Sequence, residues 1–210
     1  YFIDPQNNWL RVTLEELCAK RYKEVERVSF NLKRQGFKFD FEKLRKTGSD
    51  YMGFGQIIGH METFPKNITK MKKDLKSKNP EFFDVINHYF RKKKGTLLEE
   101  TAMPIKDAMQ MIKKAGGMAI LAHPAKHLKW EQDYIILEMK KMGLAGIEVL
   151  SPYHTWHQVE HYQKFAKKNR LKITGGSDLH SNIPRNEASL IFSQWDYHKV
   201  PYTIYEKLKR

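Results

Sequence analysis

A carboxylate and an imidazole lie two residues apart, directly after a short apolar stretch late in the sequence. Residues 171–174 are typical of a β-strand, and the two glycines that follow them predict a tight turn. Asp178 and His180 come next, and both side chain types are ligands for divalent metal ions. Taken alone, the same pattern also fits a helix-capping aspartate and an ordinary surface histidine, so the other predicted strands must decide.

Histidines follow two further predicted strands. Residues 118–122 form a short apolar strand that stops at His123, and residues 146–150 form a second predicted strand that stops at the segment ending in His154. The carboxyl ends of parallel strands meet at one edge of a sheet or barrel, where α/β proteins place their active sites. We therefore expect four side chains to converge and favour a metal site: His123, His154, Asp178 and His180.

The other polar residues near these strands are assigned less chemistry. His127, His157 and His161 are expected to be exposed loop or helix residues. Glu148 lies within the second strand, and we expect it to support a metal ligand rather than to bind metal itself. His60 follows a glycine in a predicted loop, where either a structural or a functional role is open.

Helices and strands alternate in the second half of the chain. Apolar stripes predict helices near 104–115, 135–142 and 159–166, and residues 188–192 are a candidate fourth strand. Such alternation with short connections is typical of a parallel sheet or barrel flanked by helices. We therefore assign residues 99–210 to a β/α unit.

The first half of the chain predicts a different architecture. Thr13 and Glu16 form a capping-box pattern that predicts a helix from Thr13 to about Gln35, and a short helix capped by Asp40 follows. Residues 48–59 are glycine-rich and predict a loop, and residues 65–94 contain two helical patterns. We assign residues 1–98 to a mostly helical, basic unit.

Composition limits the classes of protein that fit. The chain has 210 residues, one cysteine and no apolar run of membrane-span length, so we expect a cytoplasmic protein without a disulfide framework or a membrane partner. The formal net charge is +14, and residues 66–94 hold ten Lys and Arg against three Asp and Glu. This charge fits an anionic partner such as nucleic acid or phosphate groups, and it also fits solvated lysine faces.

Three segments, AGGMAILAHP, GLAGIEVLSPYH and ITGGSDLH, resemble in this order the PHP (polymerase and histidinol phosphatase) family of metal-dependent phosphoesterases. They are most similar to its stand-alone branch, whose members act on nucleotides or on short RNA from the 5′ end. The resemblance covers the last half of the chain, including the closing VPYTIYEKL. The helical first half resembles, more loosely, the insertion that this branch carries within its barrel.

The resemblance implies a distorted seven-stranded (β/α)7 barrel of the α/β class, with a helical insertion and two or three Mn, Fe or Zn ions at its C-terminal rim. It implies that His123, Asp178 and His180 are metal ligands and that His154 is a catalytic residue close to the substrate phosphate. The family's Arg-Pro-His element is not present, but His60 lies near its place and is a candidate substrate contact. The N-terminal His-x-His motif and the first barrel strands are also not found, so we expect Tyr1 to correspond to a point just past them.

Three functional hypotheses follow. The first is a metal-dependent phosphoesterase that uses a metal-activated water on phosphorylated nucleotides or short oligonucleotides, in the manner of a 5′–3′ exonuclease. The second is a non-catalytic nucleic-acid-binding module with a degenerate metal site. The third is a small-molecule phosphatase similar to histidinol phosphatase.

Overall fold

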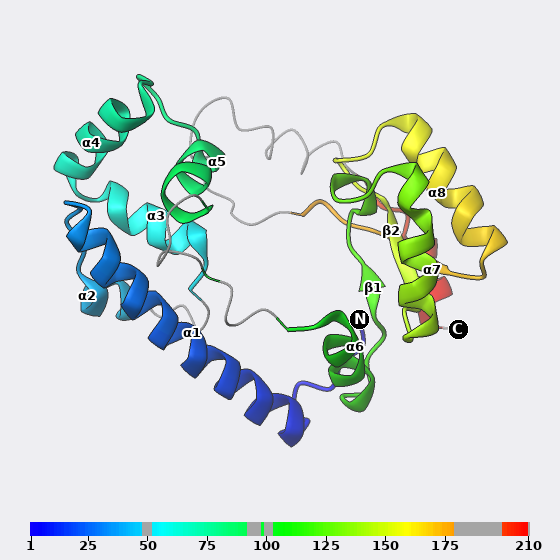
Figure 1. Ribbon diagram of the computed structural model, residues 1–210. Helices are drawn as coiled ribbons and strands as arrows, with labels where there is room; N and C mark the ends of the chain where they lie inside the picture. Colours follow the sequence, from blue (N-terminus) through cyan, green and yellow to red (C-terminus); the bar gives the residue numbers. More distant parts are fainter. Residues whose placement is uncertain (48–51, 92–97, 99–102, 179–198, 210) are drawn as a thin grey trace. The chain divides into compact units, whose positions relative to one another are not determined.

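The chain forms two compact units (Figure 1). One unit comprises Asn8–Met103 and is helical, and the other combines Tyr1–Asn7 with Pro104–Arg210 and contains the sheet. The computed structural model describes residues 1–47, 52–91, 98, 103–178 and 199–209.

The helical unit is built from short helices around a single apolar core. Its elements are α1 (Asn8–Arg34), α2 (Phe41–Arg45), α3 (Phe54–Glu62), α4 (Pro65–Leu75), α5 (Phe82–Val85) and the π-helical segment η1 (Ile86–Arg91). The core contains the buried side chains of Val28, Leu32, Ile57, Tyr89 and Phe90, among others. None of the helices in the described ranges is long and apolar enough to cross a membrane.

The first helix differs from its prediction at one end and agrees at the other. It begins at Asn8 rather than at Thr13, whose hydroxyl donates to the Trp9 carbonyl 2.8 Å away from inside the helix. The predicted capping role of Thr13 is therefore wrong. The helix ends as expected: Gly36 has a φ of +85°, and the Phe37 N–H donates to the Leu32 carbonyl.

The loop predicted over residues 48–59 is wrong in its second half, where α3 lies. Ile57, Ile58 and Met61 are fully buried, and their burial outweighs the low helix propensity of the glycines in the same stretch. His60 belongs to this helix too and is only 6% exposed. The other short helix was predicted correctly, since the Asp40 carboxylate accepts from the Lys43 N–H at the start of α2.

The β/α unit alternates strands and helices along the chain. Its elements are α6 (Ile105–Lys114), β1 (Ile120–Leu121), the 3₁₀ turns η2 (Pro124–Lys126) and η3 (Trp130–Gln132), α7 (Asp133–Lys141), β2 (Gly146–Leu150), α8 (Trp156–Lys168), β3 (Lys172–Gly175) and α10 (Tyr202–Lys209). Helix α8 begins with a capping box in which the side chains of Thr155 and Gln158 accept from each other's N–H. Its position therefore follows from local sequence.

The three strands of the described residues form a parallel sheet in the order β1-β2-β3, which confirms the predicted parallel pairing. Ile120 pairs with Gly146, and Gly146 pairs in turn with Lys172. The apolar core beneath the sheet includes Ile136, Ile147 and Tyr162. The structure thus shows an α/β fold, while the predicted fourth strand at 188–192 lies outside the described residues.

The first residues of the chain belong to the sheet-containing unit, which differs from their predicted place in the helical one. The Tyr1 ammonium group donates to the Met118 carbonyl at 3.0 Å, and the Met118 N–H donates to the Tyr1 carbonyl at 2.8 Å. The Asp4 N–H donates to the Ala115 carbonyl at 2.8 Å. These bonds hold the N-terminal segment against the connection between α6 and β1.

Candidate active site

Side chains from the ends of all three strands meet at the carboxyl edge of the sheet. His123 follows β1, Tyr153 follows β2 and Asp178 follows β3. The His123 Nε2 atom lies 3.9 Å from Asp178 Oδ1, and the Tyr153 hydroxyl donates to Asp178 Oδ2 at 2.9 Å. The convergence of His123 and Asp178 that the sequence suggests is therefore present in the structure.

The backbone at His123 is fixed by a buried carboxylate. His123 has a φ of +30°, a left-handed conformation that costs energy for a residue with a side chain. Its N–H donates to Glu148 Oε2 at 3.0 Å, and Glu148 is only 8% exposed. The Nδ1 atom of His123 is buried without a hydrogen-bond partner among the described residues. Glu148 thus supports the loop that carries a predicted metal ligand, as the sequence indicates.

The chain has little room for side chains where it passes from β3 to Asp178. A Cβ atom on Gly176 would lie 3.3 Å from Glu148 Oε1, and one on Gly175 would lie 2.8 Å from the Leu150 Cβ. The absence of side chains lets this strand end approach β2 closely. Asp178 itself has a φ of +52°, which turns the chain at the site.

Lys126 places a positive charge beside Asp178. Its Nζ atom lies 3.7 Å from Asp178 Oδ2 and 3.8 Å from the centroid of the Tyr153 ring, within range of a cation–π interaction. Sequence reasoning assigned no role to Lys126 or Tyr153. Their positions gave a signal, because Lys126 is three residues after His123 and Tyr153 directly precedes His154.

Both ring nitrogens of His154 make hydrogen bonds with backbone groups near this cluster. Nδ1 lies 2.8 Å from the Val149 carbonyl oxygen, and Nε2 accepts from the Ala125 N–H at 3.3 Å. Burial, the main cause, lowers the pKa of His154, so the neutral ring is favoured. The predicted contact with a substrate phosphate stays a prediction, and it requires the longer of these two bonds to break.

His60 is a core residue of the helical unit, which corrects its predicted place in a loop. Its Nε2 accepts from the Asp40 N–H at 3.2 Å, and its ring packs edge-on against the rings of Phe39 and Phe64. Burial lowers its pKa. Because the side chain is buried and partnered, the structure gives no support to a substrate contact at His60.

The remaining predicted ligand, His180, lies outside the described residues. Two histidines that were expected to be exposed loop or helix residues contact other side chains. His127 packs 5.2 Å from the ring of His123, and His161 makes a 2.7 Å hydrogen bond to Asp133 Oδ2.

The described part of the chain offers two ligands for a metal ion rather than a complete set. No group of three His, Cys, Asp or Glu side chains in it is arranged to hold an ion. His123 and Asp178 face each other at 3.9 Å, beyond direct hydrogen-bond distance. An imidazole and a carboxylate suit Mn, Fe and Zn alike. The residues present therefore fit part of a metal site.

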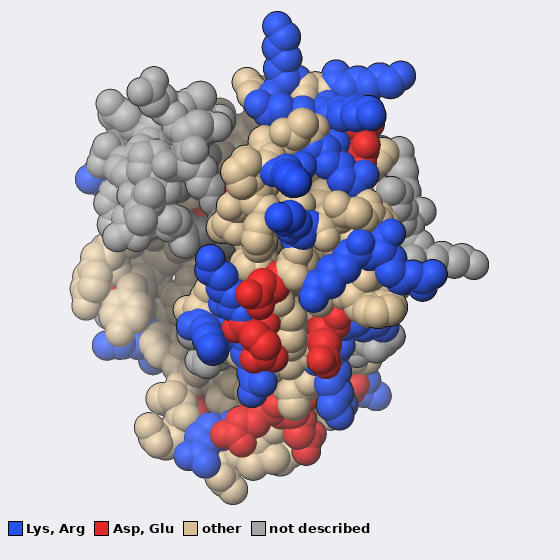
Figure 2. All heavy atoms as spheres, turned by 90° about the vertical axis from the view of Figure 1, so that its left-hand side faces the viewer, with Lys and Arg blue, Asp and Glu red and all other residues tan. Residues whose placement is uncertain are grey.

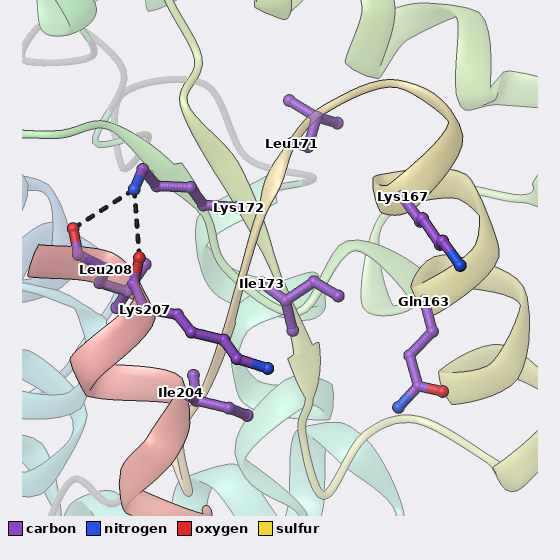
Figure 3. Close-up of a pocket in the computed structure, with 8 residues that line it drawn as sticks. All are labelled: Gln163, Lys167, Leu171, Lys172, Ile173, Ile204, Lys207 and Leu208. Carbon is purple, nitrogen blue, oxygen red and sulfur yellow. Dashed lines mark hydrogen bonds between the residues drawn. The ribbon is translucent and has the colours of Figure 1, made fainter. Parts of the chain in front are cut away.

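A groove of about 550 Å3 lies on another part of the β/α unit (Figure 3). It is lined by Leu171, Lys172 and Ile173 at the start of β3 and by residues of α8 and α10. Lys172 donates to the Lys207 and Leu208 carbonyls at the end of α10. The cluster around Asp178 lies at the opposite end of β3, so this groove is not the candidate active site.

Parts of the chain are similar in sequence to known phosphoester-cleaving enzymes. No family model matches the chain. A phosphoribosyl 1,2-cyclic phosphate 1,2-diphosphodiesterase of Eggerthella lenta is 34% identical over 80 residues, which are 38% of this chain and 29% of that protein. A 3′,5′-nucleoside bisphosphate phosphatase of Chromobacterium violaceum is 33% identical over 79 residues, 37% of this chain and 28% of that protein.

A longer match links the chain to a 5′-3′ exoribonuclease of Haemophilus influenzae, which is 24% identical over 171 residues. That match covers 80% of this chain and 57% of the relative. The chain thus spans less than a third of the first two relatives and little more than half of the third.

Two solved structures share the fold. One is a proposed metal-dependent phosphoesterase from Bifidobacterium adolescentis, with a TM-score of 0.65 and 21% identity over 98% of this chain and 67% of that one. The other is an amidohydrolase from Chromobacterium violaceum with bound sulfate and no metal, with a TM-score of 0.60 and 20% identity over 92% and 69% of the two chains. The chain resembles metal-dependent phosphoesterases. The resemblance inferred from the three sequence segments is therefore confirmed.

Proposed function

We propose that the complete protein is a metal-dependent phosphoesterase that hydrolyses phosphoester bonds of nucleotides or short oligonucleotides, in the manner of a 5′–3′ exonuclease. The observation that carries this proposal is the meeting of His123 and Asp178 at the carboxyl edge of the parallel sheet. The names of the relatives support it, because all three cleave phosphoester bonds of nucleotide or related sugar phosphates.

The proposal includes a fold larger than the described sheet. The three parallel strands would belong to the C-terminal part of a (β/α)7 barrel, completed by strands outside the described residues. The helical unit would be an insertion within that barrel. The partial coverage of the relatives supports this arrangement.

His123, Asp178 and His180 would hold part of a cluster of two or three Mn, Fe or Zn ions. Bound ions of this kind lower the pKa of water and neutralise phosphate oxygens. The remaining ligands would come from the part of the barrel that contains the His-x-His motif.

The residues around these ligands have separate roles in the proposal. Lys126 presents its ammonium group at the edge of the site, where it would attract and orient a phosphate group. Tyr153 donates to Asp178 Oδ2 and so fixes the direction of the other carboxylate oxygen. His154, through its bond to the Ala125 N–H, holds the turn between His123 and Lys126.

The helical unit would attract the rest of a polyanionic substrate. On α4 and the residues after it the exposed side chains include Lys66, Lys72, Lys73, Lys76 and Lys78. Figure 2 faces the side of the molecule on which the helices of the helical unit lie. Lys and Arg side chains gather at the upper end of that side, where α4 lies in Figure 1. Lysines that contact phosphates strengthen binding without reading sequence.

The proposed activity is tested with the complete protein and Mn²⁺. Three substrates are compared: a 5′-phosphorylated RNA tetramer, adenosine 3′,5′-bisphosphate and histidinol phosphate. We expect metal-dependent turnover of the first two and a loss of at least a hundredfold in Asp178→Asn. Asp107→Asn, an exposed carboxylate in α6, is the control and should keep full activity. Turnover of histidinol phosphate alone would assign a small-molecule phosphatase instead.

The exposed lysines after Pro65 also favour a second candidate, a nucleic-acid-binding module without catalysis. This module would bind single-stranded RNA with a steep salt dependence and with no requirement for metal. If the complete protein hydrolyses none of the three substrates yet binds RNA equally well in Mn²⁺ and in EDTA, the binding module replaces the enzyme.

A further inference from the structure

Two exposed tryptophans follow the ends of β1 and β2. Trp130 begins the turn η3 and is 48% exposed, and Trp156 begins α8 and is 77% exposed. The segments that carry them leave the sheet at the same edge as His123 and Tyr153. Large aromatic side chains exposed on segments that leave the sheet at the edge of a candidate active site are candidates for ligand contact.

One face of the Trp130 indole packs against a neighbouring ring. Its indole ring stacks on the His161 imidazole, with ring centroids 4.8 Å apart and planes at 12°. His161 is fixed by its 2.7 Å hydrogen bond to Asp133, and its ring also stacks near Phe165. The exposed indole face is therefore preorganised, and little side-chain freedom is lost when a flat ligand stacks on it.

Positive charge accompanies the aromatic surface. Lys126 and Lys129 are exposed on the segment that leads from His123 to Trp130, and the exposed carboxylate of Glu131 follows directly after Trp130. Exposed aromatic rings and lysines on segments that follow a proposed phosphate-cleaving centre suit a polyanion that carries planar rings. Single-stranded nucleic acid has this chemistry, because every base has a face that stacks on an aromatic ring.

We propose that Trp130 and Trp156 are base-stacking positions for a single-stranded oligonucleotide whose terminal phosphate lies near Asp178. This inference rests on the proposed function and narrows its substrate class from nucleotides or short oligonucleotides to oligonucleotides. Stacking of one base on an aromatic side chain strengthens binding by about fivefold to a hundredfold. Loss of either indole should therefore weaken the binding of an oligonucleotide more than that of a mononucleotide, which offers only one base.

The test measures binding separately from catalysis. A 5′-phosphorylated adenylate octamer with a 3′ fluorescein is titrated with the complete protein in EDTA, and its anisotropy is followed. Trp156→Ala and Trp130→Ala should each raise Kd about tenfold, whereas Trp156→Phe, which keeps an aromatic face, should raise it less than threefold. Met142→Ala removes an exposed apolar side chain from the opposite edge of the sheet, where α7 ends, and should have no effect.

Several outcomes would overturn the stacking proposal. They are wild-type affinity in both alanine variants, no binding of the octamer by the wild-type protein, and equal losses in Trp156→Ala and Trp156→Phe. Sedimentation that shows a dimer in the wild type and a monomer in Trp156→Ala would assign the indole to a subunit interface.

Cleavage assays distinguish a failure of the stacking proposal from a failure of the proposed phosphoesterase function. With Mn²⁺, the alanine variants should lose about tenfold in kcat/KM on the octamer and less on adenosine 3′,5′-bisphosphate, which carries a single base. A protein that cleaves neither substrate refutes the phosphoesterase assignment, and the anisotropy titration in EDTA still decides whether the indoles bind bases.

Discussion

Lys126 Nζ lies 3.7 Å from Asp178 Oδ2, so a fixed positive charge stands next to a proposed metal ligand. The Lys126 side chain is 35% exposed and that of Asp178 is 21% exposed, so solvent screens the pair only in part. The ammonium group and a divalent ion would compete for the same carboxylate. Lys126 would therefore weaken metal binding while it strengthens phosphate binding.

We predict that Lys126→Ala changes these two affinities in opposite directions. Mn²⁺ should bind the metal-free complete protein about threefold more tightly, because a partly exposed ion pair contributes about 0.2–1 kcal/mol. KM for a 5′-phosphorylated tetramer should rise about tenfold, because a cation facing the phosphate is lost. Isothermal titration calorimetry measures the first change and steady-state kinetics the second.

Lys129→Ala is the control for this prediction, because it removes another exposed lysine from the same segment, next to Trp130. It should leave the Mn²⁺ affinity unchanged. Weaker Mn²⁺ binding in Lys126→Ala would show that the lysine supports the carboxylate instead of competing for it.

A second prediction concerns the hydrogen bond from the His123 N–H to Glu148 Oε2. Glu148→Ala leaves that N–H without its acceptor in a buried place and should lower the free energy of unfolding by about 1–3 kcal/mol. Glu148→Gln keeps an oxygen of the same reach and should lose less than half as much. Urea unfolding followed by circular dichroism measures both variants. Equal losses in the two would mean that the carboxylate charge, rather than the hydrogen bond, stabilises this turn.

Much of the fold could be predicted from local sequence because the signals agree with the packing. The strand β2 occupies residues 146–150 as predicted, since an apolar run bounded by glycine has few alternatives when both faces are buried. The start of α1 was missed because Thr13 and Glu16 match a capping box although they lie inside the helix. Helix α3 was missed because its glycines suggest a loop, while the burial of Ile57 and Ile58 depends on distant residues.

Only those residues of the candidate site that directly follow the strand ends could be predicted from the sequence. His123 and Asp178 meet because parallel strands bring their carboxyl ends together. The contacts of Lys126 and Tyr153 with Asp178 depend on the path of two loops and on side-chain rotamers, which no periodicity encodes. The burial of His60 likewise depends on rings from other segments of the helical unit.

A third prediction uses two glycines that should respond oppositely to alanine. A Cβ atom on Gly146 would overlap the Lys172 carbonyl oxygen of the adjacent strand and lie 2.9 Å from the Ile120 Cδ1 atom. Gly146→Ala should therefore push β2 and β3 apart and destabilise the protein by about 1–3 kcal/mol.

Gly59 provides the opposite case. It lies inside α3, and an added Cβ would meet nothing within 4 Å. Gly59→Ala should stabilise the helical unit by about 0.5–1 kcal/mol, because alanine loses less backbone entropy in a helix. Differential scanning calorimetry of both variants checks the signs. A stable Gly146→Ala protein would show that the close approach of the strands is not required.

The last prediction is a pH dependence that originates at His60. Burial lowers the pKa of His60 below its ordinary value of 6.5, so the unfolded chain binds a proton more readily than the folded one. The contribution of the neutral ring to stability is therefore complete above pH 6.5 and is lost as the pH falls from 6.5 toward the lowered pKa.

We expect the melting temperature of the helical unit to fall between pH 6.5 and pH 5, and to fall less in His60→Gln, which does not titrate in this range. The neighbouring Asp40, whose pKa is lowered from 3.8 mainly by the Lys43 N–H, stays ionised throughout this window and does not mask the effect. Thermal melts of both proteins at half-unit pH steps make the comparison. Parallel curves for the two would show that another group causes the pH dependence, because only the wild type carries an imidazole between the Phe39 and Phe64 rings.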